Sequence, residues 1–196
     1  MKRISLALAA LWSPFLVQAD PPGEELAWVV QSRQLALALG SQMKGELARA
    51  IGEGGPVAAI DVCNTRAPQV AAQLSQDSGA RVGRTALRVR NPSNAPDEFE
   101  RTVLEQFVTD LAEGPVDRPL EAVFEIRRGD AVERRYMRAI ATDALCLTCH
   151  GGTLAPELAA AIAQRYPGDL ATGFGQGQLR GAFSVTWPAV PLAPAP

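Results

Sequence analysis

Cys146-Leu147-Thr148-Cys149-His150 is the stretch around which this chain is organised. The pattern Cys-x-x-Cys-His is typical of the site at which a c-type haem is attached to a polypeptide. Each thiol can form a thioether bond with one vinyl group of the porphyrin, and the adjacent histidine can then bind the iron. Because His150 is the only histidine in the chain, no other imidazole is available as an iron ligand. The motif therefore predicts one covalent haem c held by Cys146 and Cys149, with His150 as an axial ligand.

Two other interpretations of the motif remain open. Cys146 and Cys149 resemble the pair of a redox disulfide, but the βαβ pattern that accompanies a thioredoxin-type motif is missing upstream. A zinc site needs about four nitrogen or sulfur ligands. Only Cys63 is left to join the two cysteines and His150 in such a site. We favour haem because the beginning of the chain indicates export.

Export is predicted by the first residues. Basic residues 2–3 precede an apolar run over residues 4–17, and residues 17–19 (VQA) suit a cleavage site. We therefore expect a signal peptide over residues 1–19 and a periplasmic mature protein. A membrane anchor is the alternative, but Pro14 interrupts the run, which is shorter than the ~20 apolar residues of a spanning helix. We expect a protein that does not span the membrane after processing.

Charge and cysteine content narrow the function. The chain has 19 basic and 21 acidic residues, a net charge of −2 and no basic tract, so nucleic acid is an unsuitable partner. The chain has three cysteines, an odd number for an exported protein. With two of them bound to haem, Cys63 is left as a thiol that needs an explanation.

The expected fold class is α+β with an antiparallel sheet. Helical spacing of apolar residues, ended by glycine or proline, predicts helices over residues 24–51, 68–76, 96–113 and 156–165. Residues 57–63 are either a short helix or a buried strand. Alternating or apolar segments predict strands over residues 81–90, 120–127, 132–142 and 180–187. We expect one domain over residues 20–187 and a disordered Pro/Ala tail over residues 188–196.

Three residues are candidates for the second axial ligand. Met43 and Met137 could serve, because methionine is a common iron ligand in cytochromes c, but each also has an ordinary explanation as a core residue. Cys63 could be a small buried hydrophobe. An unpaired thiol in an oxidising compartment is nevertheless at risk, and iron would bind and protect it as a thiolate.

Six blocks of the sequence, in order along the chain, resemble one family. The blocks are residues 59–64 (AIDVCN), 82–85 (VGRT), 90–97 (RNPSNAPD), 146–151 (CLTCHG), 166–174 (YPGDLATGF) and 179–185 (LRGAFSV). The family comprises small exported haem c proteins with a PAS-like fold, related to the sensory regions of bacterial histidine kinases. The resemblance implies a PAS-like antiparallel sheet packed on the haem. It also implies iron ligation by His150 and Cys63.

The propionates of a haem are anionic and need cationic partners. Candidates on or beside the predicted strands are Arg84, Arg88, Arg90, Arg138 and Arg180. Each arginine could equally belong to a solvated face.

The leading hypothesis is a periplasmic protein for redox sensing or one-electron transfer, because two axial ligands leave iron no open position. The alternative is a haem-based sensor of gas or small molecules with a displaceable distal ligand. A peroxidase would need a distal acid–base group, and the only histidine is already used. We therefore expect a non-catalytic protein that works with an unidentified redox or signalling partner protein.

Overall fold

The structure is a computed structural model that describes residues 26–114 and 118–191. Its centre is a four-stranded antiparallel sheet with the spatial order β1-β4-β3-β2. The strands are β1 (Arg81–Thr85), β2 (Glu121–Arg128), β3 (Ala131–Ala141) and β4 (Leu179–Pro191). The predicted α+β class with an antiparallel sheet is confirmed. The expected signal peptide over residues 1–19 lies outside the described residues, as do residues 20–25 and 192–196.

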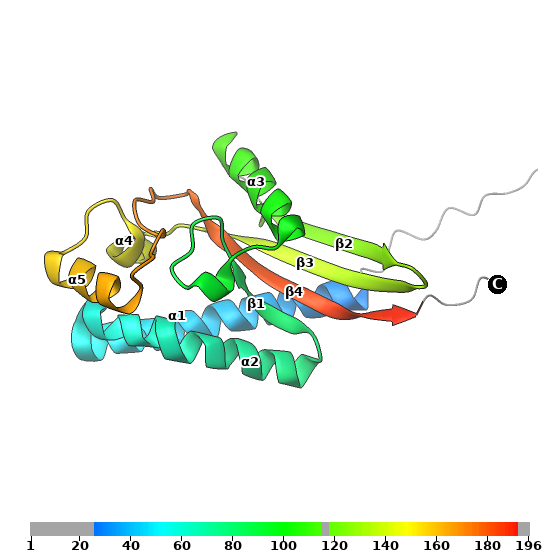
Figure 1. Cartoon of the computed structure of the whole chain (residues 1–196), viewed down its shortest axis with the longest axis horizontal. Helices are drawn as coiled ribbons and strands as arrows, with labels where there is room; N and C mark the ends of the chain where they lie inside the picture. Colours follow the sequence, from blue (N-terminus) through cyan, green and yellow to red (C-terminus); the bar gives the residue numbers. More distant parts are fainter. Residues whose placement is uncertain (1–25, 115–117, 192–196) are drawn as a thin grey trace, which may run out of the picture.

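Helices cover both faces of the sheet. They are α1 (Ala27–Asp61), α2 (Ala67–Ser78), α3 (Glu98–Ala112), α4 (Ala144–His150) and α5 (Pro156–Arg165). A π-helical turn, η1 (Val62–Arg66), joins α1 to α2, and a short 3-10 turn, η2 (Pro92–Asn94), precedes α3. Figure 1 shows α1 and α2 along one face, α3 against the other, and α4 with α5 beyond one end of the sheet.

Two neighbouring residues of β3 show how the core is divided. Tyr136 is fully buried and belongs to a cluster with Leu39 of α1 and Val185 of β4. The next residue, Met137, is buried in a cluster with Leu104 of α3. Because successive side chains of a strand point to opposite faces, the sheet separates two cores. Met137 therefore has the core role that was the alternative to iron ligation.

α1 is longer than predicted and is broken in the middle. Gly55 has φ 73° and ψ −178°, a conformation that glycine adopts without a Cβ penalty, and Pro56 begins the next helical turn. The glycines expected to end the helix thus mark a break, after which helix resumes as far as Asp61. The segment 57–63, open between helix and strand, is helical, and Cys63 lies in the π-helical turn that follows.

The strand predicted over residues 81–90 is wrong beyond Thr85. The backbone N–H of Ala86 donates to the carbonyl of Asn94 at 3.2 Å instead of to a sheet neighbour. At Gly181 of β4, a Cβ atom would lie 2.5 Å from the Thr85 carbonyl oxygen, so the two backbones cross closely here. The chain therefore leaves the sheet at Ala86, and the rest of the predicted strand is a loop.

β4 is longer than the predicted strand over residues 180–187, and the predicted tail is wrong for residues 188–191. Val190 lies opposite Val132 and Pro191 opposite Ala131 in the register with β3. The pairing with β1 ends at Thr186, so β4 beyond that point is an edge strand. Proline is tolerated on an edge because its missing N–H faces solvent.

Among the described residues, no helix combines the length and apolar character needed to cross a bilayer.

Candidate cofactor site

The helix α4 presents Cys146, Cys149 and His150 immediately after the last strand of the hairpin. Asp143 caps its first turn, since a carboxylate oxygen accepts from the backbone N–H of Cys146 at 3.1 Å. Cys146 and Cys149 are three residues apart, so their side chains lie one above the other on one face of the helix. The two thiols are thus placed to act on a single neighbouring molecule.

The residues after the motif leave α4 through a tight turn. A Cβ atom at Gly151 would lie 2.5 Å from the carbonyl oxygen of Leu147, so a larger residue would displace the turn. The backbone N–H of Phe174 donates to the carbonyl of His150 at 2.9 Å, and that of Gly173 donates to the carbonyl of Gly151 at 2.9 Å. The glycine-containing loop before β4 therefore holds the end of α4 in place.

The ring of His150 is held with one nitrogen free. Its Nδ1 lies 2.6 Å from the carbonyl oxygen of Ala171. A carbonyl can only accept, so Nδ1 carries the proton and Nε2 keeps its lone pair. Burial, followed by the charges of Arg180 and Arg90, lowers the pKa of His150 to about 3. The imidazole is therefore neutral near pH 7, and this orientation is the one that metal-binding histidines share.

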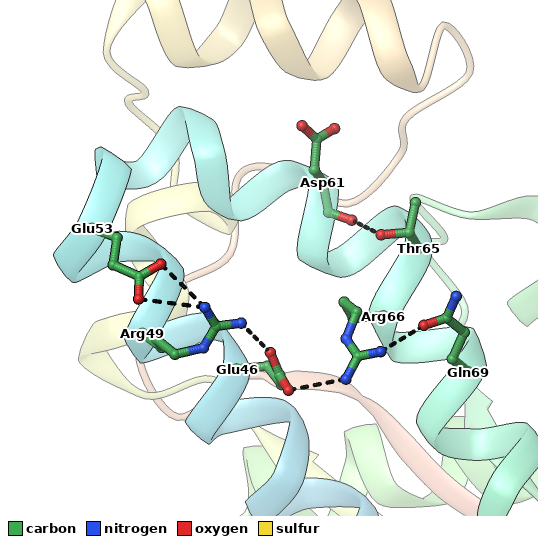
Figure 2. A network of polar contacts seen from close by, with 7 residues as sticks. All are labelled: Glu46, Arg49, Glu53, Asp61, Thr65, Arg66 and Gln69. Atoms are coloured by element: carbon green, nitrogen blue, oxygen red, sulfur yellow. Dashed lines mark hydrogen bonds and ion pairs between the residues drawn. The ribbon is translucent and has the colours of Figure 1, made fainter.

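Cys63 lies in the π-helical turn η1, which a polar network anchors (Figure 2). The hydroxyl of Thr65 donates to the carbonyl of Asp61 at 2.7 Å, within the turn. Arg66 pairs with Glu46 of α1 at 3.2 Å, and Glu46 in turn pairs with Arg49 at 2.7 Å. π-Helical turns occur frequently at functional sites, since their extra residue redirects a side chain. Here the turn carries a half-buried cysteine between two long helices.

One cavity brings the predicted ligands together. Its lining includes Cys63, Cys146, Cys149 and His150, with apolar side chains from α1, α2 and β4. The space between protein atoms, including the open mouth, is ≈1430 Å³. Sites for cofactors are typically concave and mostly apolar. Residues far apart in the sequence, from α1, η1, α2, α4 and three of the strands, thus line one cavity.

The three cysteines are free thiols. Burial raises the pKa of Cys146 and also that of Cys149, so both are protonated near pH 7. Within the described residues, no group of three or more His, Cys, Asp or Glu side chains is close enough to hold a metal ion. The alternative zinc site, built from the same four residues, is therefore not assembled in this structure.

The candidate arginines differ in their surroundings. Arg84, Arg90 and Arg180 line the cavity. Arg138 does not, because its guanidinium pairs with Glu121 at 2.8 Å, and we withdraw it as a propionate partner. Arg88 is also outside this cavity. Its guanidinium lies over the ring of Phe174, 4.1 Å from the ring centroid, and donates to the carbonyl of Leu170.

The three arginines that line the cavity differ in whether an acidic residue pairs with them. Arg90 is buried and pairs with Asp169 at 2.9 Å, and it also donates to the carbonyl of Cys149 at 2.6 Å. Arg84 has no hydrogen-bond or ion-pair partner among the residues that the structure describes. Arg180 donates to the carbonyl of Arg88 at 3.3 Å, but its buried Nε has no partner there. The cavity thus contains cationic donors that a bound anion would satisfy.

Met43 lines the cavity and packs against the core that α1 forms with the sheet.

Three other residues were missed by sequence reasoning. Tyr166 lines the cavity, Asp169 pairs with Arg90, and the carbonyl of Ala171 orients the ring of His150. All three fall within the block 166–174 that resembles the haem family, and that block was the available signal.

Comparisons with known proteins show the family to which the chain belongs. A family model described as Tll0287-like matches residues 9–188. Among solved structures, the crystal structure of the cyanobacterial haem protein Tll0287 matches with a TM-score of 0.58 and 30% sequence identity. That match covers 89% of this chain and 100% of the other. A search of curated proteins gave no match.

Proposed function

This chain belongs to the Tll0287-like family, which includes a haem protein, and from that membership we propose that it is a periplasmic protein with one covalent haem c. We propose redox sensing or one-electron transfer as its role. The observation that supports this most directly is the single cavity lined by two thiols, a neutral imidazole with a free nitrogen, and a third cysteine.

The residues of α4 suit the attachment of a haem. Cys146 and Cys149 are free and share a helical face, as two thioether bonds to one porphyrin require. Nε2 of His150 is the free nitrogen beside them. Arg84 and Arg180 line the cavity without an acidic partner among the described residues and suit the propionates, whereas Arg90 already pairs with Asp169. The haem, when bound, supplies an iron that exchanges one electron between its ferric and ferrous states.

We assign Cys63 as the second axial ligand. It comes from η1, a different element from the one that carries His150, and it lines the same cavity. A thiolate favours ferric iron, so we expect a reduction potential well below that of a His/Met cytochrome.

Export and the PAS-like classification complete the proposal. The basic start and apolar run of residues 1–19 support secretion, which places the chain where haem c is attached. The antiparallel sheet with helices on its faces and a ligand cavity at one end is compatible with a PAS-like sensor.

Visible and electron paramagnetic resonance spectra of the matured protein test the ligation. Cys63→Ala should change the ferric spectrum, because the iron loses a sulfur ligand. Met43→Ala is the matched control, since Met43 lines the same cavity and is the competing ligand. An altered ferric spectrum in Met43→Ala, with no change in Cys63→Ala, would contradict the assignment.

Carbon monoxide titration of the ferrous protein separates the two roles. Redox sensing or electron transfer predicts slow or substoichiometric binding while Cys63 occupies the iron. Rapid stoichiometric binding in the wild type would favour the alternative, a gas or small-molecule sensor. A purified protein whose mass equals that of the bare polypeptide would exclude both.

A further inference from the structure

Arg84 of strand β1 lines the cavity and has no acidic partner among the described residues. Val82, two residues earlier, is buried in the cluster that α1 shares with the sheet. Side chains two residues apart on a strand point to the same face, so Arg84 points to the side of the sheet that holds α1, η1 and α2. Its guanidinium is half-buried, lines the cavity and lacks a hydrogen-bond partner throughout the described part of the chain. A cationic donor that lines a cavity without an acidic partner can be satisfied by an anionic group bound there.

Tyr166 brings a second donor to the same place. It follows the last residue of α5 and is buried, with its ring packed against Ile60 of α1. Its ring therefore rests one helical turn before Cys63. The residue lines the cavity, and its hydroxyl has no hydrogen-bond partner among the described residues. Position, burial and the open hydroxyl make Tyr166 a donor toward the cavity rather than a purely apolar core residue.

Cys63 is the group that these two donors share. Cys63, Arg84 and Tyr166 line the same cavity, so a negative charge on the Cys63 sulfur would act on both of the other groups. Glu46, the acidic residue that lines the cavity, is already paired with Arg49 and Arg66, and Asp169 is paired with Arg90. As a thiolate, Cys63 would therefore bring to the cavity the negative charge that Arg84 lacks.

We infer that Arg84 and Tyr166 are positioning residues that donate hydrogen bonds to the thiolate of Cys63 when it binds iron, and thereby raise the reduction potential. This inference rests on the haem ligation proposed above. Donors to a ligating sulfur withdraw electron density from it, and such outer groups tune a metal site strongly. Arg84 is thus reassigned from the set of candidate propionate partners, and Arg180 keeps that role.

Electron paramagnetic resonance and redox titration of the complete haem-loaded protein test the inference. In Arg84→Gln, the ferric g-values should shift toward those of a stronger thiolate donor. The ratio of ferric to ferrous protein at a fixed ambient potential should rise about tenfold, equivalent to about 59 mV for one electron. Tyr166→Phe, which removes one hydroxyl, should shift the ratio about threefold in the same direction. Arg84→Lys should restore most of the wild-type behaviour.

Two controls separate the possible outcomes. Arg88→Gln removes an exposed arginine outside the cavity and should leave the g-values unchanged. If Arg84→Gln lowers the potential but neither it nor Tyr166→Phe alters the g-values, while Cys63→Ala does, Arg84 acts on a propionate and the inference is overturned. If Cys63→Ala itself leaves the g-values unchanged, the ligation proposal fails, and this inference fails with it.

Discussion

The two edges of the sheet hold arginines on the same face under opposite conditions. At the β2 edge, Glu121 accepts hydrogen bonds from Arg33, Tyr136 and Arg138, with N···O or O···O distances of 2.7–3.1 Å. We call these four residues the Glu121 cluster. At the β1 edge, Arg84 lines the cavity beside Cys63 and has no carboxylate partner within the described residues.

The charges of the Glu121 cluster pair with one another and stabilise the fold, whereas the charge of Arg84 has no carboxylate partner among the described residues. The pKa of Glu121 is lowered because the hydrogen bonds from Arg33 and Tyr136 outweigh the opposing effect of burial. Its cluster is complete and needs nothing from outside. The cavity has the same type of cation beside a cysteine instead of a carboxylate, and a cation away from water is costly until it gains a negative partner. From composition alone, Arg84 and Arg138 would be equally good candidates for binding an anion.

The largest effect is expected when the thiols of Cys146 and Cys149, at the cavity end of the sheet, are removed. Cys146→Ala with Cys149→Ala should abolish covalent haem completely, because both thioether bonds lose their sulfur. Mass spectrometry of the exported protein should then give the mass of the processed polypeptide alone. Cys63→Ala is the control and should retain the full mass of the attached haem. Retention of covalent haem in the double variant would refute the attachment site.

The next largest effect is expected in the Glu121 cluster. Glu121→Gln should lower the free energy of unfolding by about 2–3 kcal/mol, since it removes the negative charge that Arg33 and Arg138 share. Urea denaturation measures this loss, and haem content should stay at the wild-type level. Glu125→Gln is a matched control: its pair with Arg134 is largely exposed and should contribute at most about 1 kcal/mol. Loss of haem from Glu121→Gln would erase the contrast between the two edges.

Arg180→Gln should have effects of opposite sign with and without haem. Burial, followed by Arg84 and Arg90, lowers the pKa of Arg180 to about 10, as expected of a cation that lacks an acid. In the haem-free background, the free energy of unfolding should be unchanged or higher. In the haem-bound protein it should fall by about 1.5 kcal/mol, because a propionate loses its donor. Arg138→Gln should instead destabilise both forms. Equal destabilisation of both forms by Arg180→Gln would contradict its assignment as a propionate partner.

The smallest effect should appear in the acid range. The pKa of Glu121 is below its ordinary value of 4.5 in the folded protein, so its stabilisation is present above that value and is lost as the pH falls through the folded pKa. Glu121→Gln should therefore show a shallower loss of stability in acid than the wild type. For one proton the slopes differ by at most about 1.4 kcal/mol per pH unit. Urea titrations at a series of pH values below 5 measure this difference, and parallel curves would show that Glu121 is not involved.

Local signals predicted much of the fold. The helix expected from Pro96 begins with Asp97 as its cap, in a capping box with Glu100, and the hairpin of β2 and β3 has its turn at Gly129. The same signals were wrong where a distant partner decides. Alternation continues past Thr85, but the backbone N–H of Ala86 donates to the carbonyl of Asn94 and the chain leaves the sheet there. Prolines over residues 188–191 indicate a tail, yet β3 offers them a pairing edge.

The site was predicted in the same uneven way. The attachment motif identified Cys146, Cys149 and His150 because their chemistry depends on spacing within five residues. The carbonyl that orients His150 and the acid that neutralises Arg90 come from Ala171 and Asp169, which no local pattern connects to them. Five arginines looked alike in sequence, since a guanidinium has the same charge wherever it occurs.

The sequence by itself determined the Cys-x-x-Cys-His motif, the α+β class and the odd number of cysteines, because these depend on residue identity and short-range spacing. Only the tertiary structure decided which arginines are neutralised and which face the cavity. It also decided where strands end and that a π-helical turn brings Cys63 to the same cavity as His150. The physical reason is that the energy of a buried charge depends on its neighbours in space, and folding selects those neighbours from distant parts of the chain.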